Sequence, residues 1–189
     1  MIAEKIIRLI STLYYLCVKN GTVMIENIVF DWGDTVMRDY PDLPRAMCDW
    51  PHVELIPHVY PALEELKSKY TLVISTTAGV SDTAAMIRAL ERVEVKEMFS
   101  KFYSSKELGV AKPDPRFFTE VCRRAGLQPQ RTVMVGNDYE KDIVGAKTAG
   151  LKTVFFNEKH RQGEYPSADV MIYSMSDLCM AIEKLELMA

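Results

Sequence analysis

Residues 27–35 read Asn-Ile-Val-Phe-Asp-Trp-Gly-Asp-Thr, a short apolar run that stops at a carboxylate. An apolar run that is continuous, and does not alternate with polar residues, is typical of a strand covered on both faces of a parallel sheet. Similar runs recur at residues 71–74, 132–135 and 153–156. The sequence therefore predicts at least four buried parallel strands, the first of them over residues 25–30.

Helical segments separate these strands. Apolar residues recur at helical spacing in five segments, which are residues 62–69, 81–90, 115–125, 141–149 and 175–187. Pro115 favours the start of its helix and Gly126 the end. Weaker patterns at residues 101–104 and 170–173 predict two further strands, the second at a sheet edge. Repeated strand–helix units predict an α/β fold, a doubly wound, Rossmann-like parallel sheet with helices on both faces.

Composition excludes several classes of protein. The 189 residues include 23 Lys and Arg against 26 Asp and Glu, and the formal net charge is −3. This length fits a single domain, and the slightly acidic balance lacks the basic field of a general nucleic-acid binder. The four cysteines are far apart with no Cys-x-x-Cys pair, which argues against a zinc site or a disulfide framework. We expect a protein of the reducing cytoplasm.

Residues 1–23 precede the strand–helix pattern. Their apolar residues recur at helical spacing, which predicts an amphipathic helix that extends the domain of residues 24–189. The segment is too polar to cross a bilayer and lacks a signal-peptide cleavage pattern, so we expect no membrane association. Three readings stay open: the helix packs on the domain, it packs on a second subunit of a homo-oligomer, or Met24 is the natural start.

Polar side chains follow the predicted strands where their carboxyl ends meet. They comprise carboxylates, hydroxyls and an ammonium group: Asp31, Asp34, Ser75, Thr76, Lys112, Asn137, Asp138 and Asp142. In doubly wound sheets the site lies beyond these strand ends. A carboxylate nucleophile accepts a phosphoryl group, while hydroxyls and a lysine hold its oxygens. Paired carboxylates are oxygen ligands for Mg²⁺. Each residue alone also has an ordinary explanation as a turn, cap or surface residue.

Three motifs resemble those of the haloacid dehalogenase superfamily: Phe-Asp-Trp-Gly-Asp-Thr at residues 30–35, Ala-Lys-Pro-Asp-Pro-Arg-Phe-Phe at 111–118, and the stretch from Val135 to Leu151. The similarity covers residues 25–173. It implies a hydrolase that uses Mg²⁺ and forms an aspartyl-phosphate. Position by position, Asp31 resembles the nucleophile and a metal ligand, and Lys112 the lysine between nucleophile and phosphate. Ser75, with Thr76 in the neighbouring slot, resembles the phosphate-binding hydroxyl, and Asn137, Asp138 and Asp142 span the acidic metal-binding loop.

One departure from the family pattern bears on catalysis. Family phosphatases carry a general acid and base two residues after the nucleophile, and that position is Gly33 here, with Asp34 one residue later. Gly33 retains the backbone carbonyl that serves the family as a metal ligand. Loss of a positioned acid or base typically costs ~10²–10⁴-fold in rate. Asp34 is the candidate replacement. Asn137, where the family commonly has Asp, is a second departure.

The length of the chain leaves little room for a cap domain. Only residues 36–59 separate the first strand from the next helix, and they are rich in proline. We therefore expect a capless or minimally capped site, with Trp32, Trp50 and Tyr139 as candidates to line it. Dehalogenation, which needs no metal and usually comes with a helical cap, fits less well.

The sequence predicts an Mg²⁺-dependent phosphohydrolase that acts through an aspartyl-phosphate at Asp31. Its substrate is a phosphorylated small molecule or a macromolecular phosphate. The alternative is a module with the same fold that binds a phosphorylated ligand or protein without turnover, and the glycine at position 33 motivates it.

Overall fold

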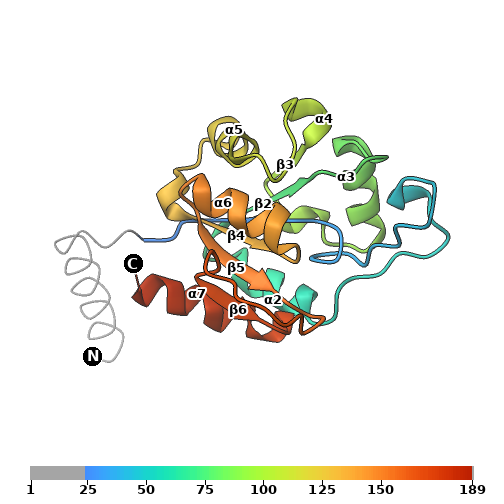
Figure 1. The fold of residues 1–189 in the computed structure, drawn as a ribbon. Helices are drawn as coiled ribbons and strands as arrows, with labels where there is room; N and C mark the ends of the chain where they lie inside the picture. The colour runs from blue at the N-terminus through green and yellow to red at the C-terminus, as the bar shows by residue number, and fades with distance from the viewer. Residues whose placement is uncertain (1–23, 189) are drawn as a thin grey trace, which may run out of the picture.

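A computed structural model describes residues 24–188, and Figure 1 shows their arrangement. A single sheet of six strands has the order β3-β2-β1-β4-β5-β6, and all its pairs are parallel. The strands are β1 (Asn27–Phe30), β2 (Thr71–Thr76), β3 (Lys101–Ser104), β4 (Thr132–Gly136), β5 (Lys152–Phe156) and β6 (Val170–Ile172). The predicted fold class is confirmed.

The register places the ends of the central strands side by side. Phe30 pairs with Ile74 on one side and with Val135 on the other. The chain runs outward from β1 through β2 and β3, then crosses back to β4 on the other side of β1. This reversal of strand order opens a crevice at the carboxyl ends of β1 and β4, where ligands of doubly wound proteins bind.

Helices cover both faces of the sheet (Figure 1). The helical elements are η1 (Met47–Asp49), α2 (Val59–Leu66), α3 (Thr83–Arg92), η2 (Lys96–Met98), α4 (Ser105–Leu108), α5 (Pro115–Ala125), η3 (Pro129–Arg131), η4 (Tyr139–Val144), α6 (Gly145–Thr148), η5 (Met175–Asp177) and α7 (Leu178–Leu187). Ile28 and Phe30 point into the larger core with α2, α3 and α7, whereas Val29 points into the core with α5 and α6. Burial on both faces explains the continuous apolar runs.

Most element boundaries agree with the prediction. The helix of residues 115–125 is found as predicted, and Gly126 ends it with a φ of 73°, a left-handed conformation that glycine adopts without steric cost. One helix differs. Residues 141–149 do not form a single α-helix, because the wider π-helical turns of η4 come first and α6 follows. Such wide turns occur frequently at functional sites.

The segment between β1 and α2 is short and held against the domain. Its one helical element is η1, so no sizeable cap domain follows β1. Met47, Cys48 and Trp50 are buried in the larger core. The Arg92 guanidinium, at the end of α3, donates to the carbonyl oxygens of Cys48 at 2.9 Å and Trp50 at 2.6 Å. The segment therefore forms a fixed wall beside the strand ends.

The predicted N-terminal helix of residues 1–23 lies outside the described residues. Among residues 24–188, no helix is both long and apolar enough to cross a membrane.

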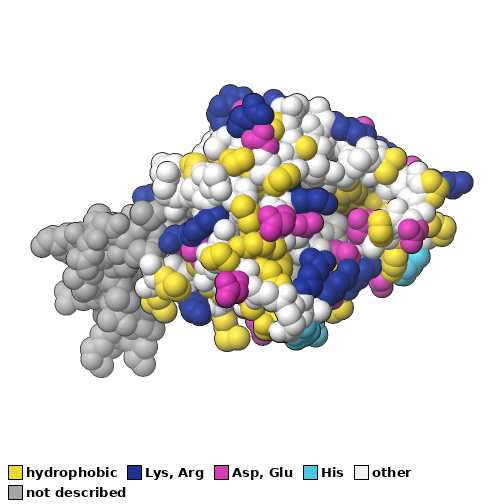
Figure 2. Space-filling view, in the orientation of Figure 1, with side chains coloured by type: hydrophobic (Ala, Val, Ile, Leu, Met, Phe, Trp, Pro, Cys, Tyr) yellow, Lys and Arg dark blue, Asp and Glu magenta, His cyan; other side chains and the backbone are white. Residues whose placement is uncertain are grey.

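Figure 2 shows basic and acidic side chains interspersed over the face that it presents.

Candidate active site

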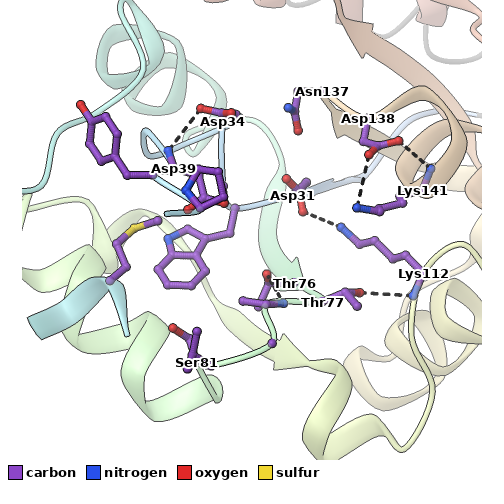
Figure 3. A pocket seen from close by; sticks show the side chains of 18 of the residues that line it. Asp31, Asp34, Asp39, Thr76, Thr77, Ser81, Lys112, Asn137, Asp138 and Lys141 are labelled. Carbon is purple, nitrogen blue, oxygen red and sulfur yellow. Dashed lines mark hydrogen bonds and ion pairs between the residues drawn. The ribbon is translucent and has the colours of Figure 1, made fainter. Parts of the chain in front are cut away.

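A cavity of about 460 Å³ opens at the carboxyl ends of the central strands. Asp31 follows β1, Thr76 ends β2, and Asn137 and Asp138 follow β4. All four line the cavity together with Lys112, which reaches it from the loop before α5 (Figure 3). The structure thus brings most of the predicted residues together, because parallel strands in register deliver their ends to one rim.

Lys112 is the centre of a buried charge cluster. Its ammonium Nζ donates to Asp31 Oδ1 at 2.7 Å, to Asp142 Oδ1 at 2.9 Å and to the carbonyl oxygen of Ser75 at 3.2 Å. Only 2% of the side chains of Lys112 and Asp142 is exposed, against 13% for Asp31. Asp31 is therefore the most exposed member of the cluster at the cavity.

Burial and charge shift the pKa values in this cluster. Burial would lower the pKa of Lys112, but the carboxylates of Asp142 and Asp31 outweigh it, and the pKa is raised above its usual value. Lys112 is therefore a permanent cation. Burial and the negative charge of Asp31 raise the pKa of Asp142, although Lys112 opposes the shift. The ammonium group thus compensates two carboxylates that would otherwise repel each other.

The Asp142 carboxylate holds the Lys112 ammonium group and the Asp138 backbone in place. Its Oδ1 accepts from Lys112, and its Oδ2 accepts from the Asp138 N–H at 3.0 Å, so both oxygens are engaged. The strand end approaches so closely that a Cβ on Gly136 would collide with the Asp142 carboxylate. Asp138 caps η4, where its Oδ1 accepts from the Lys141 N–H at 3.0 Å. Asp142 therefore positions Lys112 and the Asp138 backbone, and its role as a metal ligand stays a prediction.

The hydroxyl groups at the end of β2 also differ from expectation. Ser75 is fully buried and does not line the cavity, and its hydroxyl has no hydrogen-bond partner among residues 24–188. Thr76 and Thr77 line the cavity instead. The Thr76 hydroxyl accepts from the Ala78 N–H at 3.1 Å, and the Thr77 hydroxyl from the Lys112 N–H at 3.2 Å. Each threonine keeps its own hydroxyl proton to donate to an anion. Sequence reasoning missed Thr77 because it lies three residues beyond the strand predicted at residues 71–74.

Asp34 lines the cavity, but its carboxylate is engaged in ion pairs. Its Oδ1 accepts from Arg38 at 3.2 Å and its Oδ2 lies 3.7 Å from Lys159 Nζ. Arg38 in turn forms a bidentate pair with Glu158, at 2.7 and 2.8 Å. With two cations beside it, Asp34 is a poor candidate for the predicted acid and base.

A carboxylate that sequence reasoning missed, Asp39, also lines the cavity. Burial and the charges of Asp34 and Asp31 raise its pKa above the usual range, against a hydrogen bond from the Tyr40 N–H. Asp39 does not follow directly after a strand, since the loop after β1 brings it to the site. Of the aromatic candidates, Trp32 and Trp50 line the cavity and Tyr139 does not, because it packs edge-on against Phe155.

The oxygen donors fit a magnesium ion. Asp31 Oδ2 and Asn137 Oδ1 both lie within hydrogen-bond distance of the Thr35 hydroxyl, at 3.1 and 3.2 Å, and that hydroxyl has only one proton to give. One of the two oxygens therefore keeps its lone pairs for a cation. Residues 24–188 bring no three His, Cys, Asp or Glu side chains together as a ready metal cage. Mg²⁺ needs no such cage, since it keeps several waters and one or two carboxylates suffice.

Fold and site together define a class: a doubly wound α/β hydrolase with a carboxylate and a buried lysine at the switch point of the sheet. The profile of the haloacid dehalogenase-like hydrolase family matches residues 19–156, and the chain belongs to that family.

Several of the relatives are phosphatases by name. A glyceraldehyde 3-phosphate phosphatase of Methanocaldococcus jannaschii is 31% identical over 183 residues, which cover 86% of this chain and 79% of that protein. The enzyme of the same name from Methanothermobacter thermautotrophicus is 36% identical, over 57% of this chain and 47% of its own length. The chain spans about half the length of several such relatives.

Solved structures share the fold. An uncharacterised Listeria monocytogenes protein has a TM-score of 0.74 with 21% identity, over 85% of this chain and 99% of that one. A phosphatase from Thermococcus onnurineus has a TM-score of 0.70 with 20% identity, over 84% and 98% of the two chains.

Proposed function

We propose that this protein is an Mg²⁺-dependent phosphatase that hydrolyses phosphate monoesters through an aspartyl-phosphate at Asp31. The observation that carries the proposal is the pairing of Asp31 with the buried Lys112 at the floor of an open cavity. Lys112 orients one oxygen of Asp31 and leaves the carboxylate at the cavity surface. The phosphatase names of the relatives support the same reaction class.

In the proposed reaction, a carboxylate oxygen of Asp31 attacks phosphorus and the bond from phosphorus to the ester oxygen breaks. The positive charge of Lys112 stabilises the negative charge that develops on one phosphoryl oxygen. Thr76 and Thr77 donate their hydroxyl protons to the remaining oxygens. Water then hydrolyses the aspartyl-phosphate, which releases phosphate and restores the Asp31 carboxylate.

Asp31, Asn137 and the Gly33 carbonyl would hold the magnesium ion, and Asp138 completes the acidic loop beside them. When bound, the ion screens the charge of the nucleophile from that of the phosphate and polarises the phosphoryl group. We further propose a small phosphorylated metabolite as substrate and the cytoplasm as compartment. The free thiols of Cys48, Cys122 and Cys179 support a reducing environment.

The test is hydrolysis of 4-nitrophenyl phosphate in the presence of MgCl₂, with Asp31→Asn as the matched variant. We expect turnover by the wild type that EDTA abolishes and Mg²⁺ restores, and none by the variant. A panel of phosphorylated metabolites, read out as released phosphate, then identifies the substrate. Equal rates for wild type and Asp31→Asn would overturn the proposal. Binding of a phosphorylated ligand without any phosphate release would favour the non-catalytic alternative, which the ion pairs of Asp34 support.

A further inference from the structure

The Asp39 carboxylate lies in the space that a side chain at position 33 would enter. A Cβ built on Gly33 would lie 3.2 Å from Asp39 Oδ2 and 3.3 Å from Asp39 Cβ. Gly33, two residues after Asp31, has no carboxylate, but the Asp39 carboxylate lies beside this position. Gly33 is also the residue that allows this approach, because any larger side chain would crowd Asp39.

The loop after β1 is built to hold Asp39 there. Asp34 adopts a left-handed conformation with a φ of 54°, and its N–H donates to the Met37 carbonyl at 2.7 Å. The Asp34 carboxylate then accepts from the Asp39 N–H at 3.2 Å (Figure 3). The ion pair between Arg38 and Glu158 anchors the residue next to Asp39 on the far side of the site. Asp34 thus positions the backbone of Asp39.

Asp39 differs from the other carboxylates that line the cavity. Asp31 and Asp142 are paired with Lys112, Asp34 with Arg38, and Asp138 with Lys141. Among residues 24–188, Asp39 alone of these five has no ion-pair partner. Its side chain is partly exposed. Among the carboxylates of the cavity, Asp39 is therefore the one that a substrate can reach without displacing an ion-pair partner.

We propose that Asp39 is a catalytic residue that transfers the proton in both halves of the reaction, an inference that rests on the phosphatase function proposed above. In the first half, Asp31 bonds to phosphorus, the ester oxygen departs, and the Asp39 carboxyl gives its proton to that oxygen, so the product is an alcohol. In the second half, the Asp39 carboxylate takes a proton from water. The water oxygen bonds to phosphorus, the bond to Asp31 breaks, and phosphate is released.

The test separates proton transfer from a structural role. Asp39→Asn is compared with the wild type on 2,4-dinitrophenyl phosphate, whose leaving group departs without a proton, and on phenyl phosphate, whose leaving group needs one. With dinitrophenyl phosphate we expect the variant to release a rapid burst of one equivalent of phenolate and then to turn over ~10²–10⁴-fold more slowly than the wild type. With phenyl phosphate we expect no burst. Asp42→Asn is the matched control, since Asp42 is exposed in the same loop and does not line the cavity.

Two results would overturn the inference. One is steady-state turnover by Asp39→Asn within about threefold of the wild type on phenyl phosphate, a difference under about 1 kcal/mol. The other is loss of the burst on dinitrophenyl phosphate as well, which indicates a damaged site. If the wild type itself hydrolyses neither ester, the proposed phosphatase function fails, and the role of Asp39 fails with it.

Discussion

Lys112 neutralises two buried carboxylates, so its removal should be costly for folding as well as for activity. In Lys112→Met, the carboxylates of Asp31 and Asp142 face each other without the cation that compensates them. Breaking a buried pair in this way costs about 3–5 kcal/mol. We expect a loss of that size in the free energy of unfolding, measured by urea denaturation at pH 7, together with loss of phosphatase activity. Lys101→Met is the control, because Lys101 is exposed on β3. A loss below about 1 kcal/mol would contradict the central role of Lys112 in the charge cluster.

A substitution at Gly33 separates the two functional hypotheses, which are a phosphatase and a module that binds a phosphorylated ligand without turnover. If Gly33 has replaced the acid and base and no other residue has taken over that role, Gly33→Asp should create or raise turnover. In the structure the new Cβ would lie 3.2 Å from the Asp39 carboxylate, and the new carboxylate would face a like charge. We therefore expect the variant to lower kcat on phenyl phosphate, on the order of tenfold, which corresponds to ~1.4 kcal/mol. In an Asp39→Ala background, where the space is free, the same substitution should raise kcat. A rise in both backgrounds would contradict our account of Asp39.

At the scale of elements, Glu107 links α4, β3 and α3. The residue lies on α4, and its carboxylate accepts from the Ser104 hydroxyl at the end of β3 and from the Thr83 hydroxyl, at 2.7 Å, in the first turn of α3. Burial alone would raise the pKa of Glu107, but these hydrogen bonds outweigh burial and lower the pKa to about 2. The lowered pKa makes the ionised form a contributor to folding stability.

The sign of this contribution sets its pH dependence. It is fully present above the pKa of about 4.5 that an unfolded glutamate has, and is lost as the pH falls toward about 2. Because Glu107 is exposed to solvent, we expect Glu107→Gln to cost only ~0.5–1 kcal/mol at pH 7. The cost should shrink between pH 4.5 and pH 2, measured as the difference in free energy of unfolding between wild type and variant. A cost that grows with acidity would contradict this account.

The elements themselves were largely predictable, and the exceptions have a common physical cause. Continuous apolar runs indicate buried strands, so the position of β4 and the end of α5 at Gly126 followed from local patterns. The π-helical turns of η4 did not, because they depend on the contacts of Asp142 with Lys112 and with the Asp138 N–H. In the site, residues directly after strands were predictable from the sheet edge. Asp39 was not, because a loop with a left-handed Asp34 brings it there, and no local pattern encodes that return.

For the whole molecule, we infer that the wall formed by residues 40–50 selects the substrate, because no sizeable cap covers the site among residues 24–188. Tyr40, Leu43 and Trp50 face the cavity from this wall. The wall is held to the domain from outside the site, since Arg92 on α3 donates to the carbonyl oxygens of Cys48, Trp50 and Pro51. The chemistry and the recognition of substrate are thereby placed on separate parts of the fold.

This division predicts separable kinetic effects for Arg92→Ala. The variant leaves backbone carbonyls without their donor and loosens the wall, whereas Asp31 and Lys112 stay in the rigid sheet edge. We expect KM for 4-nitrophenyl phosphate to rise about threefold to tenfold with kcat within about twofold of the wild type, because uniform binding is lost without loss of transition-state contacts. Arg88→Ala is the matched control, since Arg88 precedes Arg92 by one turn on α3 and reaches only the Cys48 thiol, at 3.3 Å. If Arg92→Ala lowers kcat as strongly as it raises KM, the wall takes part in the chemistry itself, and the separation argued here is wrong.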